Sequence, residues 1–193
     1  MSSGPTIPEF VASPLYEEAV RLLRPHEGLA WMAIHTRPRA EKVVARRLDL
    51  LDVPYYLPLR PSIRRYKRKV VTFQIPLLTS YVFAALDPES RLAVLRTQRV
   101  VRTILVDDEE LFLHELRQIH VASRVAEDLS VTDYDPTGRR VRILTGPLAG
   151  VEGLVRERRS RRILVLNITL LQRSVQVDID LTNTKLWFLD SVR

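Results

Sequence analysis

The histidines of residues 114–120 are the side chains whose types and spacing come nearest to a metal site. His114 and His120 lie in a segment whose apolar periodicity predicts a helix. A zinc-binding helix places its two histidines four residues apart, whereas these two are six apart and so lie about 120° from each other around a helix. We therefore predict no metal site here.

No other group of residues predicts catalysis. The chain has no cysteine, which excludes disulfides, thiolate nucleophiles and cysteine-based zinc sites. No Ser/His/Asp arrangement and no pair of acids can be singled out, and His26 and His35 are interpreted as surface or core residues. We expect a protein without enzymatic activity and without a cofactor. The opposing hypothesis, a metal-dependent hydrolase, would require tightly bound metal.

A glycine-rich segment, Gly146-Pro147-Leu148-Ala149-Gly150-Val151-Glu152-Gly153, has two possible interpretations. A phosphate-binding loop would need a helix after the glycines and usually a Lys followed by Ser or Thr. A strand rich in Val and Arg follows instead. The pattern favours turns and backbone bends in a small β-barrel.

Positive charge points to an acidic partner. Thirty Lys and Arg against 23 Asp and Glu give a net charge of +7, which favours nucleic acid without proving it. Six of the ten residues at 60–69 are cations, and such a run either contacts phosphate or forms a solvated face. These cations are Arg60, Arg64, Arg65, Lys67, Arg68 and Lys69.

The first two thirds of the chain predict an α+β domain at 29–126, after an N-terminal extension with a short helix at 1–28. Apolar runs and alternation predict strands, and spacings of three and four predict helices. The expected order is β-α-β-β-β-α-β-α, which suggests an antiparallel sheet flanked by helices. The expected strands are 29–35, 55–59, 70–75, 81–86 and 100–106, with helices after Pro38, at 87–96 and from 109.

The remainder predicts a second, smaller domain. Residues 127–137 are polar and include Pro136, as linkers often do. Four short β-rich runs then follow, separated by turn residues, and predict a small SH3-like β-barrel at 138–184 with a tail at 185–193.

Several motifs resemble those of a known family. The segments Gly138-Arg139-Arg140-Val141-Arg142-Ile143-Leu144 and Gly146 to Gly153 resemble a KOW motif. Three other stretches are similar to the N-terminal domain of NusG. They are Trp31-Met32-Ala33-Ile34-His35-Thr36-Arg37-Pro38-Arg39-Ala40-Glu41, Tyr56-Leu57-Pro58-Leu59 and Pro76-Leu77-Leu78-Thr79-Ser80-Tyr81-Val82-Phe83.

The resemblance implies a transcription elongation or antitermination factor whose N-terminal domain binds the clamp helices of the largest RNA polymerase subunit. The matching positions are His35, Leu78, Tyr81 and Phe83. Strand alternation places Tyr81 and Phe83 on one face, and the alternative is that these residues are only core. Leu78, Thr79 and Ser80 replace the Phe, Pro and Gly that are usual in the family, so the turn geometry stays open.

The resemblance also implies contacts to nucleic acid. The cations of 60–69 correspond to a hairpin near upstream DNA, and Arg37, Arg47 and Arg99 lie where specialised paralogues face the non-template strand. The basic segment, the aromatic second strand and the divergent turn resemble the RfaH and capsule-operon types.

The KOW domain is expected to recruit a second partner, a small-subunit ribosomal protein or Rho. The corresponding residues are Leu170, Leu171 and Arg173, and in a strand one of the two leucines would be exposed. A ribosome-associated or RNA-binding KOW protein is the main alternative. Helical spacing of Leu164, Ile168 and Leu171 also leaves open a barrel that refolds as helices.

The same comparison and the composition suggest a cytoplasmic monomer. Residues 1–10 lack the pattern of a signal peptide, and no run approaches the roughly 18 apolar residues of a spanning helix. No membrane association is expected.

Overall fold

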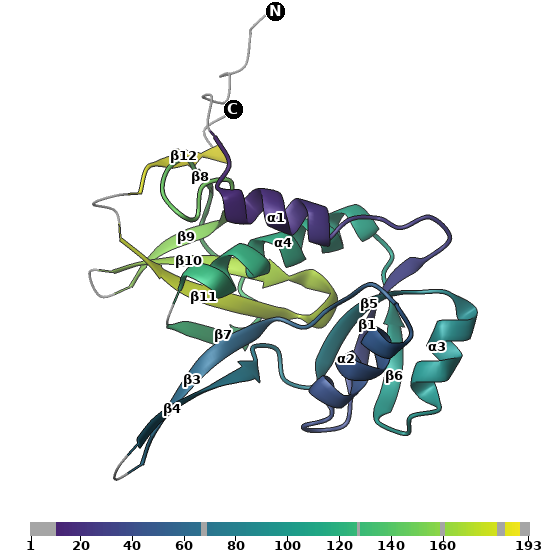
Figure 1. The fold of residues 1–193 in the computed structure, drawn as a ribbon. Coiled ribbons are helices and arrows are strands. Elements are labelled where there is room, and N and C mark those ends of the chain that lie inside the picture. The colour runs from purple at the N-terminus through teal and green to yellow at the C-terminus, as the bar shows by residue number, and fades with distance from the viewer. Residues whose placement is uncertain (1–10, 67–68, 127, 159–160, 181–183, 190–193) are drawn as a thin grey trace, which may run out of the picture. The chain divides into compact units, whose positions relative to one another are not determined.

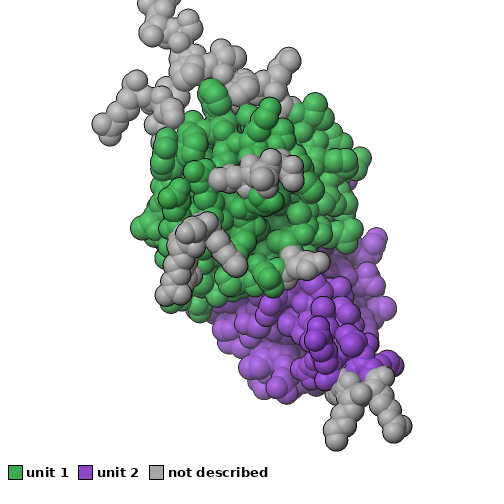
Figure 2. Space-filling view, turned by 90° about the vertical axis from the view of Figure 1, so that its left-hand side faces the viewer, with its two compact units in different colours: residues 1–22, 112–193 green, residues 23–111 purple. Residues whose placement is uncertain are grey.

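The computed structural model describes residues 11–66, 69–126, 128–158, 161–180 and 184–189. These residues form two compact units, residues 23–111 (unit 2) and residues 1–22 with 112–193 (unit 1) (Figure 2). The expected boundary between domains lies near 126, after α4. In the structure, α4 spans residues of both units.

Unit 2 contains an antiparallel sheet whose strand order is β2-β5-β1-β6 (Figure 1). A separate two-stranded ribbon, β3-β4, leaves this sheet through the aromatic strand β2. The elements are β1 (Ala30–Thr36), α2 (Glu41–Leu50), β2 (Tyr55–Tyr56), β3 (Leu59–Tyr66), β4 (Lys69–Pro76), β5 (Tyr81–Leu86), α3 (Pro88–Leu95) and β6 (Val100–Leu105). The α+β class is therefore confirmed for this part of the chain. The predicted order lacks one strand, because four strands, β2 to β5, follow one another where the sequence predicts three. The additional strand is β3, which lies in the basic run that we expected between strands.

One face of the four-stranded sheet is covered by α2 and α3. Alternate residues of β1 and β5 point to this face and pack against the apolar side of each helix, as the i, i+4 spacing in α2 predicts. The buried cluster consists of Met32, Ile34, Val44, Leu48, Val82, Ala84, Leu86 and Val94.

Local chemistry fixes where α3 begins. The Asp87 carboxylate accepts the Ser90 backbone N–H at 2.7 Å, the Ser90 hydroxyl completes a capping box, and Pro88 occupies the first turn. Hydrogen bonds from the Ser90 hydroxyl and backbone hold the pKa of Asp87 below its ordinary value.

Unit 1 contains a six-stranded antiparallel sheet of order β12-β8-β9-β10-β11-β7. In the described residues β12 and β7 are its open edges, so the closed barrel expected from the sequence is not formed there. The elements are α1 (Pro14–Leu22), α4 (Glu109–Val125), β7 (Leu129–Asp133), β8 (Arg139–Ile143), β9 (Glu152–Arg158), β10 (Arg161–Ile168), a 3-10 turn (Thr169–Leu171), β11 (Arg173–Ile179) and β12 (Leu186–Phe188).

Two strands of this sheet lie in segments that we expect to be irregular. β7 falls in the predicted linker and pairs with β11, and β12 falls in the predicted tail and pairs with β8. Part of the predicted linker and part of the predicted tail therefore form strands. Each of these strands pairs with a strand that is distant in the sequence. The four runs predicted as strands, β8 to β11, are confirmed.

The glycine-rich segment forms turns and bends, as expected. Gly150 has a φ of 98°, a region that favours glycine. A Cβ atom at Gly153 would lie 2.8 Å from the carbonyl oxygen of Val165, so only glycine fits between the strands.

Candidate nucleic-acid interface and polymerase-binding face

The predicted polymerase-binding residues lie around one face of the four-stranded sheet, the face opposite α2 and α3. The register pairs His35 with Tyr81 and Ala33 with Phe83, which places Tyr81 and Phe83 on the same side as expected from alternation. The rings of His35 and Tyr81 stack with centroids 5.1 Å apart. Neighbouring strands thus bring these two predicted residues into contact.

Their burial separates them into two pairs. Phe83 is 0% exposed and Leu78 is 2% exposed, so both are core residues in this structure. His35 and Tyr81 are half-buried. Nδ1 of His35 is also buried without a hydrogen-bond partner among the described residues. His35 and Tyr81 are therefore the two predicted residues that keep part of their surface exposed.

The turn before β5 holds this pair in place. Ser80 adopts a φ of 66°, in the left-handed region, at the position where the family usually has glycine. Its N–H donates to Oε1 of Glu41 at 2.7 Å, and its carbonyl accepts the Thr36 N–H at 2.8 Å. A buried carboxylate at the start of α2 thus fixes the turn from which Tyr81 follows.

The antiparallel ribbon β3-β4 carries the described cations of the run 60–69, which are Arg60, Arg64, Arg65 and Lys69. Directly paired residues share a face, so the pairs Ser62–Phe73 and Arg64–Val71 lie on one face. The pair Arg65–Val70 lies on the other. The positions of Lys67 and Arg68 lie outside the described residues.

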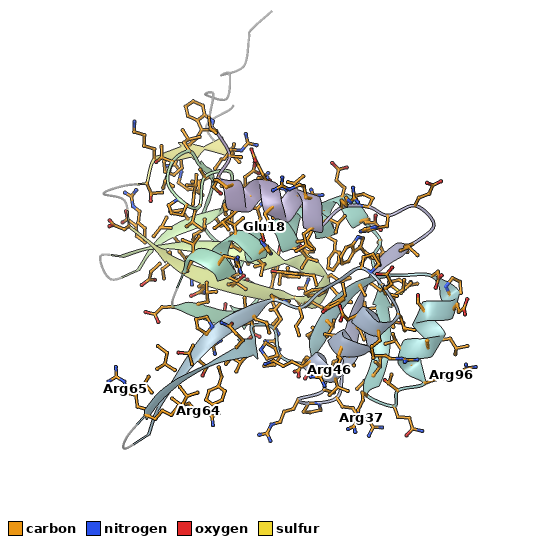
Figure 3. The ribbon with its side chains drawn as sticks, in the orientation of Figure 1. Glu18, Arg37, Arg46, Arg64, Arg65 and Arg96 are labelled. Carbon is orange, nitrogen blue, oxygen red and sulfur yellow. The ribbon has the colours of Figure 1, made fainter. Side chains whose placement is uncertain are left out.

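The ribbon is exposed on both faces. Arg64, Arg65 and Lys69 are exposed and Arg60 is half-buried, and Figure 3 shows Arg64 and Arg65 extending away from the ribbon. The guanidinium of Arg64 lies over the ring of Phe73, 5.7 Å from its centroid. At the base of the ribbon, Nζ of Lys42 donates to the carbonyl of Gln74.

A second group of cations lies where β1 ends and β6 begins. The Arg37 N–H donates to the Arg99 carbonyl at 2.8 Å and joins the two loops. Arg39 is exposed in the first loop, and Arg102, also exposed, pairs with His35 across the sheet. We call Arg37, Arg39, Arg99 and Arg102 the loop arginines.

The loop arginines carry unneutralised charge. In the part of the chain that the structure describes, none of them forms an ion pair with a carboxylate. The sequence analysis predicts Arg37 and Arg99 as contacts to nucleic acid and does not include Arg39 or Arg102. Strand pairing places Arg102 beside His35. Arg47, the other predicted arginine, is exposed in the last turn of α2.

Comparison with known proteins finds a similarity for residues 29–120. They match the family model described as NusG, transcription termination factor nusG. The segment is thus similar to the NusG family, and we call residues 29–120 the NusG family domain below. The match covers the strands of unit 2 and continues into α4.

Two other comparisons add little. The crystal structure of the MjSpt4:Spt5 complex, conformation A, is similar at 16% identity with a TM-score of 0.27, and the alignment covers 82% of this chain and 98% of that chain. This similarity is too weak to carry an argument. No curated protein matches the chain.

Beyond the NusG family domain, the predicted partner edge at 170–173 differs from a strand. Leu170 and Leu171 lie in the 3-10 turn, where strand alternation does not apply, and both are half-buried. The expectation of one exposed leucine was therefore wrong. Arg173 begins β11 and pairs with Asp133 of β7, N to O at 2.5 Å.

Glu115 of α4 caps this turn. Its Oε2 accepts the Thr169 N–H at 2.9 Å, and its Oε1 accepts the Thr169 hydroxyl at 2.6 Å. One turn further along the helix, Oε1 of Gln118 accepts the Glu152 N–H of β9 at 3.0 Å. Two buried polar side chains of α4 thus satisfy the backbone of the sheet.

The two histidines of α4 have separate partners. His114 lies beside Gln118 and Glu152, whereas His120 contacts Glu18 of α1 at 3.4 Å. Burial lowers the pKa of both histidines more than the neighbouring carboxylates raise it. Within the described residues, no three His, Asp or Glu side chains gather as a metal site.

None of the described helices is long and apolar enough to cross a membrane.

Proposed function

We propose that the protein is a NusG-like transcription elongation factor that binds RNA polymerase through the NusG family domain. The observation that carries the proposal is the family match over residues 29–120. The half-buried His35–Tyr81 pair supports it, because it combines aromatic surface with a buried ring nitrogen that has no partner among the described residues. In this proposal the clamp helices of the largest polymerase subunit cover the pair.

Nucleic acid is the second partner in the proposal. The loop arginines and the cations of the ribbon would contact phosphates of the DNA that polymerase holds, either the non-template strand or the upstream duplex. Support comes from their exposure and from the absence of ion pairs among the described loop arginines. Such contacts position a protein without reading sequence.

The six-stranded sheet is proposed to be a KOW-type domain that recruits a further protein. The positive φ of Gly150 and the crowding at Gly153 agree with the backbone bends that the motif requires. We place the partner contact at Leu170, Leu171 and Arg173, with a ribosomal protein or Rho as partner. A specialised, RfaH-like role and the absence of enzymatic activity belong to the same proposal.

Capture of core RNA polymerase tests the proposal. The full chain, immobilised, should retain purified polymerase. Tyr81→Ala should reduce retention at least tenfold because it removes one of the two half-buried rings of the stack. Leu50→Ala is the matched control, since Leu50 is 73% exposed on α2. Equal retention by both variants would contradict the proposed face, and no retention by the unsubstituted chain would contradict the function.

A ribosome-associated or RNA-binding protein is the rival function. It predicts tight binding of structured RNA by the full chain and little effect of Tyr81→Ala. Arg162→Ser should then weaken RNA binding strongly, whereas the polymerase proposal predicts only a small loss.

A further inference from the structure

The ribbon β3-β4 has two chemically distinct faces. The pairing register assigns the exposed aromatic side chain Phe73 and the exposed Ile63 to opposite faces. We call the first the Phe73 face; its described residues are Arg60, Ser62, Arg64, Lys69, Val71, Phe73 and Ile75. The opposite face presents Ile63, Arg65 and Val70 among its exposed residues.

The Phe73 face combines an aromatic ring with unneutralised charge. Phe73 is 43% exposed, and its ring contact is with Arg64. The segment 59–76 contains no Asp or Glu, and no ion pair engages Arg60, Arg64 or Lys69 among the residues described. A solvated charged face accounts for the cations, but it does not account for the exposed ring between them.

Rows of side chains on one face of a strand repeat about every 7 Å. Arg60, Phe73, Arg64 and Lys69 fall in four successive rows of this face. Along the ribbon, the row that holds Phe73 on β4 therefore lies between the rows that hold Arg60 and Arg64 on β3. This order of cation, ring and cation is complementary to an extended polyanion that has flat apolar groups between its charges.

Single-stranded nucleic acid has that chemistry. Its unpaired bases can stack on aromatic rings and its phosphates follow a cationic path. A duplex offers only phosphates and base edges, because its base faces are covered by their neighbours. An anionic protein surface would satisfy the cations but gives no reason for a flat ring flanked by guanidinium groups.

We propose that the Phe73 face binds single-stranded nucleic acid, with a base stacked on Phe73 and adjoining phosphates on Arg60, Arg64 and Lys69. The inference deepens the proposed function, because it specifies the nucleic acid and the residues of one contact. It assigns to the ribbon a role separate from that of the loop arginines.

Binding of labelled oligonucleotides to the full chain tests the inference. Fluorescein-labelled dT15 and rU15 are titrated by anisotropy at low salt, and their comparison separates DNA from RNA as the source of the strand. Phe73→Ala should raise Kd about 5- to 150-fold, which corresponds to the ~1–3 kcal/mol of base stacking. Phe73→Tyr should restore binding, because a phenol ring also stacks.

Ile63→Ala is the matched control, since it removes an apolar side chain from the opposite face that is more exposed than Phe73, 64% against 43%. It should change Kd less than twofold. Unchanged binding by Phe73→Ala, or equal losses for Ile63→Ala and Phe73→Ala, would overturn the inference. So would tighter binding of a 15-base-pair duplex than of dT15 and rU15.

Capture of RNA polymerase by the same variants tests the proposed function separately from this inference. If Phe73→Ala lowers capture of polymerase but leaves oligonucleotide binding unchanged, the face contacts protein and the inference is wrong. If the unsubstituted chain binds dT15 or rU15 through Phe73 but fails to capture polymerase, the inference holds and the proposed function fails.

Discussion

Glu41 provides a sharp test of how the turn before β5 is held. Its side chain is 5% exposed and accepts the Ser80 N–H at 2.7 Å. Glu41→Ala removes a hydrogen bond to a charged group, worth ~1.5–3 kcal/mol. It also removes a carboxylate from the first turn of α2, worth ~0.3–1 kcal/mol. We expect the free energy of unfolding of unit 2 to fall by about 2–4 kcal/mol.

The two tryptophans allow the loss of stability to be assigned to one of the two units. Trp31 is buried in unit 2 and Trp187 lies in β12 of unit 1. In a Trp187→Phe background, urea denaturation followed by fluorescence reports on Trp31 alone. The midpoint should fall for Glu41→Ala, and Glu41→Gln, which retains an acceptor oxygen, should lose less.

Asp49→Ala is the control for the loss of an acid from the same helix. Asp49 is exposed near the C-terminal end of α2, so its removal should change stability by no more than about 0.5 kcal/mol. An effect of Glu41→Ala below 0.5 kcal/mol, or one equal to that of Asp49→Ala, would refute the argument that the carboxylate holds the turn.

Three further predictions concern backbone strain, packing and pH. Ser80→Gly should stabilise unit 2 or leave its stability unchanged, because glycine removes the strain of the left-handed conformation while the N–H to Glu41 remains. A loss of more than about 1 kcal/mol in the free energy of unfolding, obtained from urea denaturation, would contradict this. Gly153→Ala should destabilise unit 1 by at least about 2 kcal/mol, measured through Trp187 in a Trp31→Phe background, because the added Cβ meets the Val165 carbonyl at 2.8 Å. The pKa of His120 is lowered in the fold by burial, so the unfolded chain takes up a proton first. Stability of unit 1 should therefore be full above about pH 6.5 and fall as the pH drops toward the folded pKa, and His120→Gln should flatten that dependence in denaturation at a series of pH values.

Much of the NusG family domain follows from the sequence because its strands and helices carry strong apolar patterns. The run 31–34 and the alternation at 81–86 predict β1 and β5, and the i, i+4 spacing of Val44 and Leu48 predicts the buried side of α2. These elements form one core, so local pattern and tertiary packing agree.

The strands that the sequence missed depend on distant partners. β7 is polar and β12 has only three residues, and both are stabilised by pairing with β11 and β8. The sequence interpretation of Leu170 and Leu171 failed for a related reason. Glu115, more than 50 residues away, caps the turn in which they lie.

The candidate sites also combine features that local sequence predicts with features that depend on distant residues. Residue type and a resemblance predict His35, Tyr81 and the cations of 60–69 as contact residues. The stack of His35 on Tyr81 follows only from strand pairing. The burial of Phe83 and Leu78 also required packing. Local sequence also does not predict the positive φ of Ser80 or the hydrogen bond that joins Arg37 to Arg99.

The two added strands of the six-stranded sheet bear on how shorter forms of the protein would behave. A fragment cut at residues 138 and 184, where the sequence places the second domain, would lack both β7 and β12. The N–H and C=O groups of β8 and β11 that those strands satisfy would then be exposed, and such edges pair readily between molecules. That fragment is expected to self-associate, whereas one that begins at residue 128 and extends to 193 keeps both edge strands.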